Sequence, residues 1–203
     1  MIITIARTLG SGGRQIGEAL AQRLGYKFYD KNLLAEAAEQ SGISAEFFAQ
    51  ADERAQQHPI TGGLFGLRFP FLSGNGGNNG LDNDTLFKLQ SDTIQAIADR
   101  ENAIFLGRCA DYVLRERKDC LRVFLYANVN DAARRVMERK QIDAEAAKEL
   151  IEKTNRQRAA YYNHYASSAW GKAQTYDISL NTSLMDFDAI VELLAGLAQR
   201  LEK

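Results

Sequence analysis

The sequence predicts an α/β fold in which a parallel sheet carries helices on both faces. Short apolar stretches typical of strands alternate with longer stretches whose apolar residues recur every three or four positions. The first strand and helix are joined by a glycine-rich turn. Such alternation indicates parallel strands joined by crossover helices. At 203 residues, the chain is long enough for one domain of this kind with a sizeable core.

The first strand and helix lie within residues 1–25, MIITIARTLGSGGRQIGEALAQRLG. Residues 2–5 are apolar and mostly β-branched, which predicts a buried strand, and from Ile16 onward the apolar residues fall on one helix face. The start of a helix after such a turn has free backbone N–H groups and the positive end of the helix dipole, so it suits a phosphate. We expect the phosphates of a nucleotide to bind at the following residues: Gly10, Ser11, Gly12, Gly13, Arg14 and Gln15.

This turn matches the standard phosphate-loop pattern only in part. With Gly13 as the second glycine, Thr8 stands at the first glycine, Arg14 at the lysine and Gln15 at the hydroxyl residue. The dinucleotide-binding pattern also fails at its third glycine, although Asp30 is placed to bind a ribose. The simplest alternative is that the glycines only let a strand turn sharply into a helix.

The remaining elements follow in order along the chain. Strands are expected at 27–29, 103–106, 121–126 and 176–180, and helices at about 31–41, 44–55, 85–100, 131–140, 144–165 and 186–201. Ser44 and Asp143 are expected to cap two of these helices. Between about 58 and 82 the chain is rich in glycine and asparagine, which predicts either a flap over a site or a disordered insertion.

Polar residues follow two of the predicted strands. Asp30 and Lys31 follow 27–29, and Arg108 and Asp111 follow 103–106. Ligands of open α/β sheets bind beyond the carboxyl ends of the strands, so these four residues are candidates for binding an acceptor. The alternative for Arg108 is a helix cap or an ion pair with Asp111.

Basic residues gather between Arg134 and Arg158, on two predicted helices joined by a short connection. If this hairpin folds over the glycine-rich turn, its guanidinium groups would neutralise a polyphosphate, as phosphoryl transfer requires. Arg156 and Arg158, close to the Tyr161-Tyr162 pair, are the candidates for that role, together with Arg14. The alternative is a solvated helix face on which glutamates pair with these cations.

Composition excludes several other classes of function. A net charge of −1 provides no general attraction for nucleic acid. Cys109 and Cys120 match neither a metal site nor a disulfide framework, which indicates reduced thiols. His58 and His164 have no metal ligand at a suitable spacing, so no metal ligand is predicted. Without an apolar run of membrane-spanning length, the chain is expected to be cytoplasmic and to have no membrane partner.

Three segments carry a resemblance to a known family: ITIARTLGSGGRQIGEALAQRLGYKFYDKNLL, LGRCADYVL and RAAYYNHYASSAWGKAQTYDISLNTS. They resemble the cytidylate kinase-like family, a branch of the phosphate-loop nucleoside monophosphate kinases. The resemblance implies a three-layer α/β/α fold with a five-stranded parallel sheet, in one domain over 1–203. It also implies an acceptor-binding insertion over 30–84 and an arginine-bearing lid over about 134–165.

The same resemblance implies transfer of a phosphoryl group from ATP, with Mg²⁺, to a nucleoside monophosphate such as CMP or dCMP. Cytidylate kinases have Gly-Lys-Gly-Thr where this chain has Gly13-Arg14-Gln15-Ile16, and an aspartate where it has Cys109. Without the loop hydroxyl, Ser11 or Thr8 could bind Mg²⁺, or ATP oxygens and water could hold it.

The alternatives to this function are a nucleotide-binding regulator, a kinase for a non-nucleotide small molecule and a dinucleotide-dependent oxidoreductase. A homodimer is left open.

Overall fold

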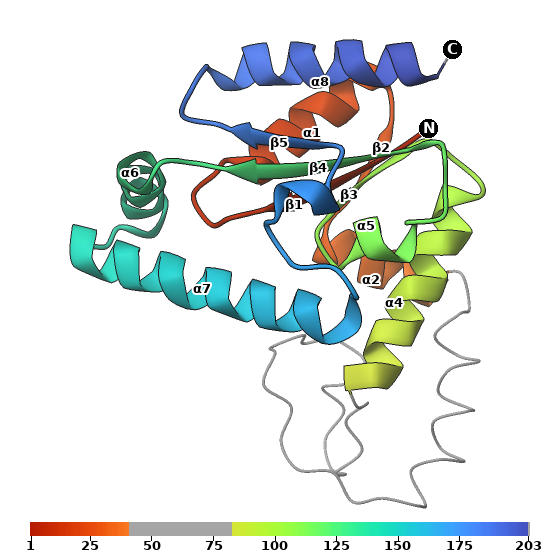
Figure 1. Cartoon of the computed structure of the whole chain (residues 1–203), viewed down its shortest axis with the longest axis horizontal. Helices are drawn as coiled ribbons and strands as arrows, with labels where there is room; N and C mark the ends of the chain where they lie inside the picture. The colour runs from red at the N-terminus through yellow and green to blue at the C-terminus, as the bar shows by residue number, and fades with distance from the viewer. Residues whose placement is uncertain (41–82, 203) are drawn as a thin grey trace, which may run out of the picture.

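Five strands form one parallel sheet in the order β2-β3-β1-β4-β5, so the predicted fold class is confirmed (Figure 1). The computed structural model describes residues 1–40 and 83–202. The strands span Ile2–Arg7 (β1), Lys27–Tyr29 (β2), Ala103–Leu106 (β3), Cys120–Tyr126 (β4) and Ile178–Asn181 (β5). Ile2 is in register with both Ala103 and Cys120, which places β1 between β3 and β4.

The helices connect these strands in chain order. They are α1 (Gly13–Leu24), α2 (Lys31–Gln40), α4 (Asn83–Ala98), α5 (Ala110–Val113), α6 (Val129–Lys140), α7 (Ala144–Tyr165) and α8 (Phe187–Leu201), with a 3₁₀ turn, η2 (Ala173–Thr175). Asp143 caps α7 as predicted, since its side chain accepts a hydrogen bond from the Ala146 N–H. The four-residue helix α5 was not predicted, because its few residues show no periodicity.

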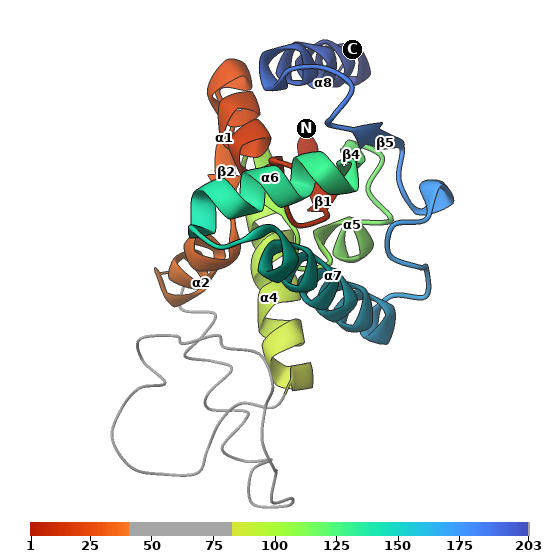
Figure 2. The ribbon, with the colours of Figure 1, turned by 90° about the vertical axis from the view of Figure 1, so that its left-hand side faces the viewer.

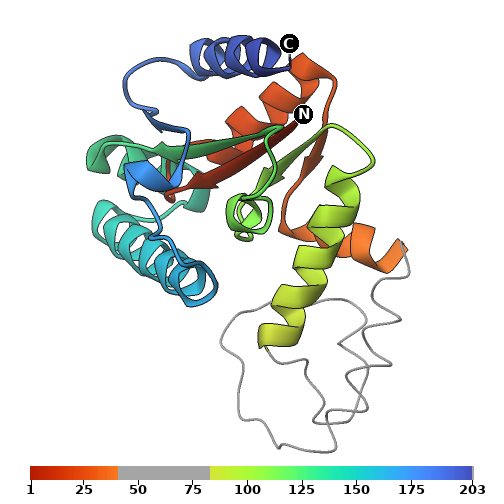
Figure 3. The same ribbon diagram turned by 45° about the vertical axis from the view of Figure 1, so that its right-hand side comes forward.

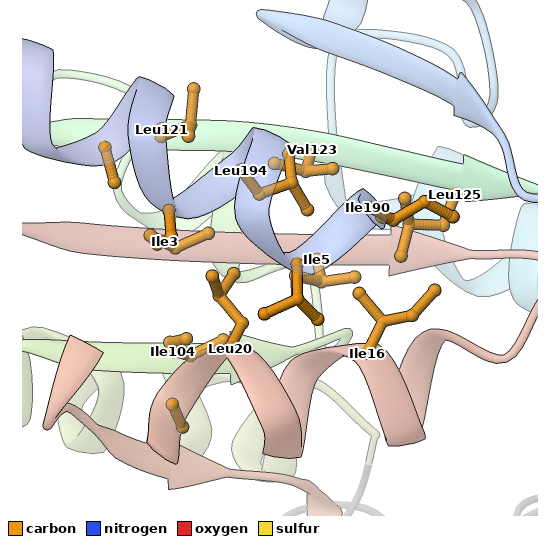
Figure 4. Packing of buried hydrophobic residues seen from close by; sticks show 14 of the residues in the cluster. Ile3, Ile5, Ile16, Leu20, Ile104, Leu121, Val123, Leu125, Ile190 and Leu194 are labelled. Carbon is orange, nitrogen blue, oxygen red and sulfur yellow. The ribbon is translucent and has the colours of Figure 1, made fainter. Parts of the chain in front are cut away.

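Helices cover both faces of the sheet, which gives three layers (Figures 1 and 2). On one face, α1 and α8 pack against each other and against the strands. Figure 4 shows Ile16 and Leu20 of α1 and Leu194 of α8 meeting Ile3 and Ile5 of β1 in this layer. On the opposite face, α4 and α5 cover the alternate side chains of the same strands.

The helices α6 and α7 form the predicted hairpin and pack against each other. The helix α6 lies beyond the carboxyl end of β4, and α7 runs from it across the open side of the sheet toward α4 (Figures 1 and 3). The hairpin therefore stands over the edge at which parallel α/β sheets bind ligands.

Several expectations fall outside the described residues: the helix after Ser44, the flap at 58–82, His58, and most of the 30–84 insertion. Within the described residues, Cys109 and Cys120 are buried free thiols. None of the helices at 1–40 or 83–202 is long and apolar enough to cross a membrane.

Truncating a side chain in the α1–α8 layer should destabilise the fold. Leu194 is fully buried, so Leu194→Ala removes apolar contacts and leaves a cavity, at a cost of about 2–5 kcal/mol in the free energy of unfolding. The neighbouring Leu193 is 45% exposed, and Leu193→Ala is the matched control, expected to cost less than about 1 kcal/mol. Urea denaturation measures both, and equal losses would contradict the assignment of this layer as core.

Candidate active site

The turn between β1 and α1 leaves the start of α1 open to an anion. Gly10 and Gly12 have positive φ angles of 82° and 75°, which glycine adopts without strain. Gly12 directly precedes the helix, and no side chain caps the helix there. The first N–H groups of α1 therefore lack a side-chain cap and carry the positive end of the helix dipole. This geometry suits a phosphate group.

Side chains from α6 and α7 hold this turn in place. Arg135 of α6 donates hydrogen bonds from Nη1 to the Gly10 carbonyl at 3.1 Å and from Nη2 to the Thr182 carbonyl at 3.0 Å. Asn155 of α7 accepts a hydrogen bond from the Leu9 N–H at 2.9 Å. The turn is thus fixed to both helices of the hairpin, and Arg135 contributes to structure.

Close packing also requires glycine in the turn. A Cβ atom at Gly10 would lie 2.7 Å from the Cα of Ala132 in α6, and one at Gly12 would lie 2.1 Å from the ring of Phe187 in α8. Neither distance is possible between non-bonded carbons, so these two glycines let α6 and α8 approach the turn directly.

A cavity of about 240 Å³ adjoins this turn at the carboxyl ends of β1 and β3. The ends of both strands line it, together with the start of α2 and one face of α7. Its polar and aromatic lining includes the cations Arg7, Lys31, Arg108 and Arg158, the carboxylate Asp111, the polar side chains Thr154 and Gln157, and the aromatic side chains Tyr161, Tyr162 and Trp170.

The cations in this cavity are buried close together, which destabilises their charged forms. Burial, followed by repulsion from Arg158 and Arg108, lowers the pKa of Arg7 to about 9, although attraction to Asp30 opposes this change. Burial is also the main cause that lowers the pKa of Arg158 to about 10 and the pKa of Lys31 below its ordinary value. A bound anion would offset both the cost of burying these charges and their mutual repulsion.

Arg108 is held in a strained segment that directs it into the cavity. Arg108 and Cys109 have φ angles of 63° and 56°, which residues other than glycine adopt only at a cost of about 1–3 kcal/mol each. The Arg108 Nε donates to Gln90 Oε1 at 2.6 Å and its Nη2 to the Tyr161 hydroxyl at 3.0 Å. The guanidinium also lies over the Tyr161 ring, 4.7 Å from the centroid. Arg108 therefore neither caps a helix nor pairs with Asp111.

Asp111 is a buried carboxylate in the cavity wall. The Tyr162 hydroxyl donates to its Oδ2 at 2.6 Å, and this hydroxyl also lies 3.0 Å from Ser168 Oγ. Burial raises the pKa of Asp111, although the hydrogen bond from Tyr162 opposes the change.

The structure places other sequence-predicted residues outside the cavity. Arg14 is 58% exposed and pairs with Glu18 Oε1 and Asp30 Oδ2, both at 2.8 Å. Arg156 is 76% exposed and lies 3.8 Å from Glu152 Oε2. In this conformation, neither guanidinium reaches the group formed by Arg7, Arg108 and Arg158.

Sequence reasoning did not identify Arg7 or Asn155. Arg7 is the last residue of β1, so the rule that ligands bind at the carboxyl ends of strands would have pointed to it. No comparable signal marks Asn155, because its role depends on how α7 packs over the turn.

The residues of the turn fit a nucleotide phosphate better than a metal ion. Gln15 is exposed, and the buried Ser11 hydroxyl donates to the Thr8 carbonyl at 2.9 Å. Among residues 1–40 and 83–202, no three His, Cys, Asp or Glu side chains gather in a way that could hold a metal. A Mg²⁺ ion bound with ATP would therefore take its ligands mainly from phosphate oxygens and water.

Comparisons with known proteins agree with this arrangement. The model of the family described as "Cytidylate kinase-like family" matches residues 2–184. The curated cytidylate kinase of Methanobrevibacter smithii is 24% identical over 195 residues, which cover 96% of each chain.

Solved structures share the fold. An uncharacterized protein from Eubacterium ventriosum has a TM-score of 0.72 at 23% identity, with 98% of each chain covered. A shikimate kinase from Bacteroides thetaiotaomicron has a TM-score of 0.54 at 16% identity, again over 98% of each chain. A gluconokinase from Sinorhizobium meliloti has a TM-score of 0.52 at 15% identity, over 98% of this chain and 91% of that one.

Adding a methyl group at Gly10 should separate α6 from the turn. Gly10→Ala combines a positive φ with a clash against Ala132, so we expect a loss of about 2–4 kcal/mol in the free energy of unfolding. Gly25 has a similar φ of 71° but open space around it, so Gly25→Ala is the matched control at about 1 kcal/mol. Chemical denaturation of both variants tests this, and equal losses would show that backbone strain alone accounts for the effect.

The raised pKa of Asp111 predicts a pH-dependent contribution to stability. The folded protein keeps a proton on Asp111 at pH values where the unfolded chain, with its ordinary pKa of 3.8, has released it. The free energy of unfolding that Asp111 contributes therefore rises as pH falls from the raised pKa toward 3.8, and it is lost as pH rises through that interval. Asp111→Asn should remove this dependence, whereas the same substitution at the exposed Asp188 should not. Denaturation curves between about pH 4 and pH 7 make the comparison, and parallel profiles for wild type and Asp111→Asn would contradict it.

Proposed function

The chain belongs to the cytidylate kinase-like family, and we propose that it transfers the γ-phosphoryl group of ATP to a nucleoside monophosphate, with CMP or dCMP as the acceptor. The observation that carries the proposal is the cation-lined cavity directly beside an uncapped helix start. The helix start suits the phosphates of a donor, and the cation-lined cavity suits an anionic acceptor. The choice of cytosine nucleotides rests on the family and on the name of the curated relative.

In this scheme the donor phosphates lie along the turn at 10–15. The N–H groups at the start of α1 bind phosphate oxygens without any loss of existing side-chain caps. When bound with ATP, Mg²⁺ would neutralise charge on the phosphates. The sequence also predicts that Arg14 binds these oxygens, and in that role it would have to leave Glu18 and Asp30.

Arg158 is proposed to stabilise the phosphoryl group during transfer. It lies on the face of α7 that lines the cavity, and its Nη1 donates to the Arg7 carbonyl at 2.8 Å. That hydrogen bond fixes the guanidinium at the end of β1, where charge would develop on the transferring group. Preorganised cations of this kind cost no reorganisation during the reaction.

Arg108 is proposed to bind the phosphate of the acceptor, with Lys31 nearby and the ring of Tyr161 beneath the guanidinium. An acceptor phosphate is already a nucleophile, so this reaction needs positioning and charge neutralisation without a general base. The aromatic side chains Tyr162 and Trp170 also line this cavity, where they would help to keep water from the transferring group.

A second candidate is a kinase for a non-nucleotide hydroxyl acceptor, and Asp111 is the observation that favours it. Such an acceptor requires a base, and Asp111 is a carboxylate in the cavity wall with a raised pKa. The solved kinases that share the fold are named for shikimate and gluconate-type acceptors.

An ADP-release assay with ATP and Mg²⁺ tests these proposals across CMP, dCMP, UMP, AMP, GMP, shikimate and gluconate. We expect turnover with CMP or dCMP. Arg108→Ala should raise the KM for the acceptor at least about 10-fold, because it removes a charge-assisted contact to phosphate. Arg158→Ala should lower kcat by about 100-fold. Arg134→Ala is the matched control on the exposed face of α6 and should change neither.

Turnover only with shikimate or gluconate would overturn the nucleotide acceptor. A rise in Tm with ATP but no turnover with any acceptor would favour a nucleotide-binding regulator.

A further inference from the structure

The position at which a phosphate loop has its lysine is occupied here by glycine. In the pattern strand–Gly-x4-Gly-Lys-Ser/Thr–helix, the lysine follows the glycine that precedes the helix. That glycine is Gly12 in the structure, so the lysine position is Gly13 and the first glycine of the pattern is Arg7. Arg14, one residue further along α1, points outward and is paired with two carboxylates.

Arg7 occupies the space that these replacements leave. A Cβ atom on Gly13 would lie 3.0 Å from Arg7 Cγ, so the stem of Arg7 runs directly over the start of α1. A Cβ on Gly107 would lie 2.1 Å from Arg7 Nη1, so the guanidinium rests against the end of β3. Glycines on two neighbouring elements thus leave a channel for this one side chain.

The position of Arg7 lies between the two halves of the proposed active site. Its stem contacts the helix start that would bind the donor, and its head contacts Gly107, the residue before Arg108. The guanidinium of Arg158 lies close by, because it donates a hydrogen bond to the Arg7 carbonyl. A phosphoryl group passing from donor to acceptor would cross this point.

The carboxylates near Arg7 are engaged elsewhere. Asp30 pairs with Arg14, and Asp111 accepts the hydroxyl of Tyr162. Within residues 1–40 and 83–202, no hydrogen bond or ion pair joins the Arg7 guanidinium to another side chain. Asp30 attracts this guanidinium, but repulsion from Arg158 and Arg108 outweighs that attraction. A guanidinium in such surroundings lacks the oxygen acceptors that its fork geometry requires.

We propose that Arg7 binds the phosphoryl group being transferred and supplies, from the end of β1, the charge that other phosphate loops supply from a lysine at the start of the helix. This inference rests on the proposed function. It makes Arg7 a second catalytic residue beside Arg158. It also explains Gly13 and Gly107, which leave room for the Arg7 side chain.

The test moves the cation from one position to the other. Arg7→Ala should lower kcat by about 100-fold or more, since it removes a preorganised charge at the transferring group. Adding Gly13→Lys to that variant rebuilds the usual pattern in the emptied channel and should restore part of the lost turnover. Gly13→Lys alone should lower turnover, because its Cβ meets the Arg7 stem.

Stability and anion binding separate this role from a structural one. Arg7 is partly buried among cations, so Arg7→Ala should not lower the Tm of the ligand-free protein. Inorganic pyrophosphate should raise the Tm of the wild type and of the Arg134→Ala control, and this rise should be much smaller in Arg7→Ala. Arg7→Lys should keep part of it, because the charge remains and the fork is lost.

The pyrophosphate measurement needs no acceptor, so it distinguishes the two proposals. The wild type could turn over no acceptor while the rise in Tm with pyrophosphate still requires Arg7. That result would support the anion site and overturn the proposed reaction. An Arg7→Ala variant with unchanged turnover and an unchanged response to pyrophosphate would overturn the role of Arg7. If Arg14→Ala lost both turnover and the pyrophosphate response while Arg7→Ala kept them, Arg14 would be the residue that binds the transferred phosphoryl group.

Discussion

Like charges held together in one cavity, with too little acidic charge beside them to balance their repulsion, are the constraint on which this site depends. Arg7, Arg108 and Arg158 line one cavity, and the carboxylates around it are bonded elsewhere. Such an arrangement lowers stability in the free protein, and proteins accept it where a ligand supplies the missing charge. The positive φ angles at Arg108 and Cys109 add strain at the same place. Charge repulsion and backbone strain therefore both destabilise the wall of the cavity. The two apolar layers against the sheet supply the stability that offsets them.

Much of the fold could be predicted from the sequence, because its periodicities are local. Strand β1, the glycine turn and helix α1 follow from residues 1–25 alone, and the strands that end at Tyr29 and Leu106 follow from short apolar stretches. The five-stranded sheet came from the family resemblance, and the structure confirms it. Short α5 was missed because four residues carry no helical period.

The candidate site was predicted less completely, since side-chain direction depends on packing. Arg156 and Arg158 are two residues apart, so they point to different sides of α7, and sequence spacing does not say which side faces the sheet. Similarly, Arg14 belongs to the exposed face of α1, which only the packing of α1 on the sheet determines. The sequence does not show that Gly12, and not Gly13, is the residue that ends the turn, so the phosphate-loop pattern alone does not mark Arg7.

The single helix α7 touches every part of the site. Asn155 binds the turn, Arg158 binds the end of β1, and Tyr161 supports Arg108. These residues lie within two turns of one helix, so a shift of that helix would displace all three together. A tilt of α7 would therefore open the donor half and the acceptor half in the same motion, so the two products would escape through one gate and their release rates would be coupled.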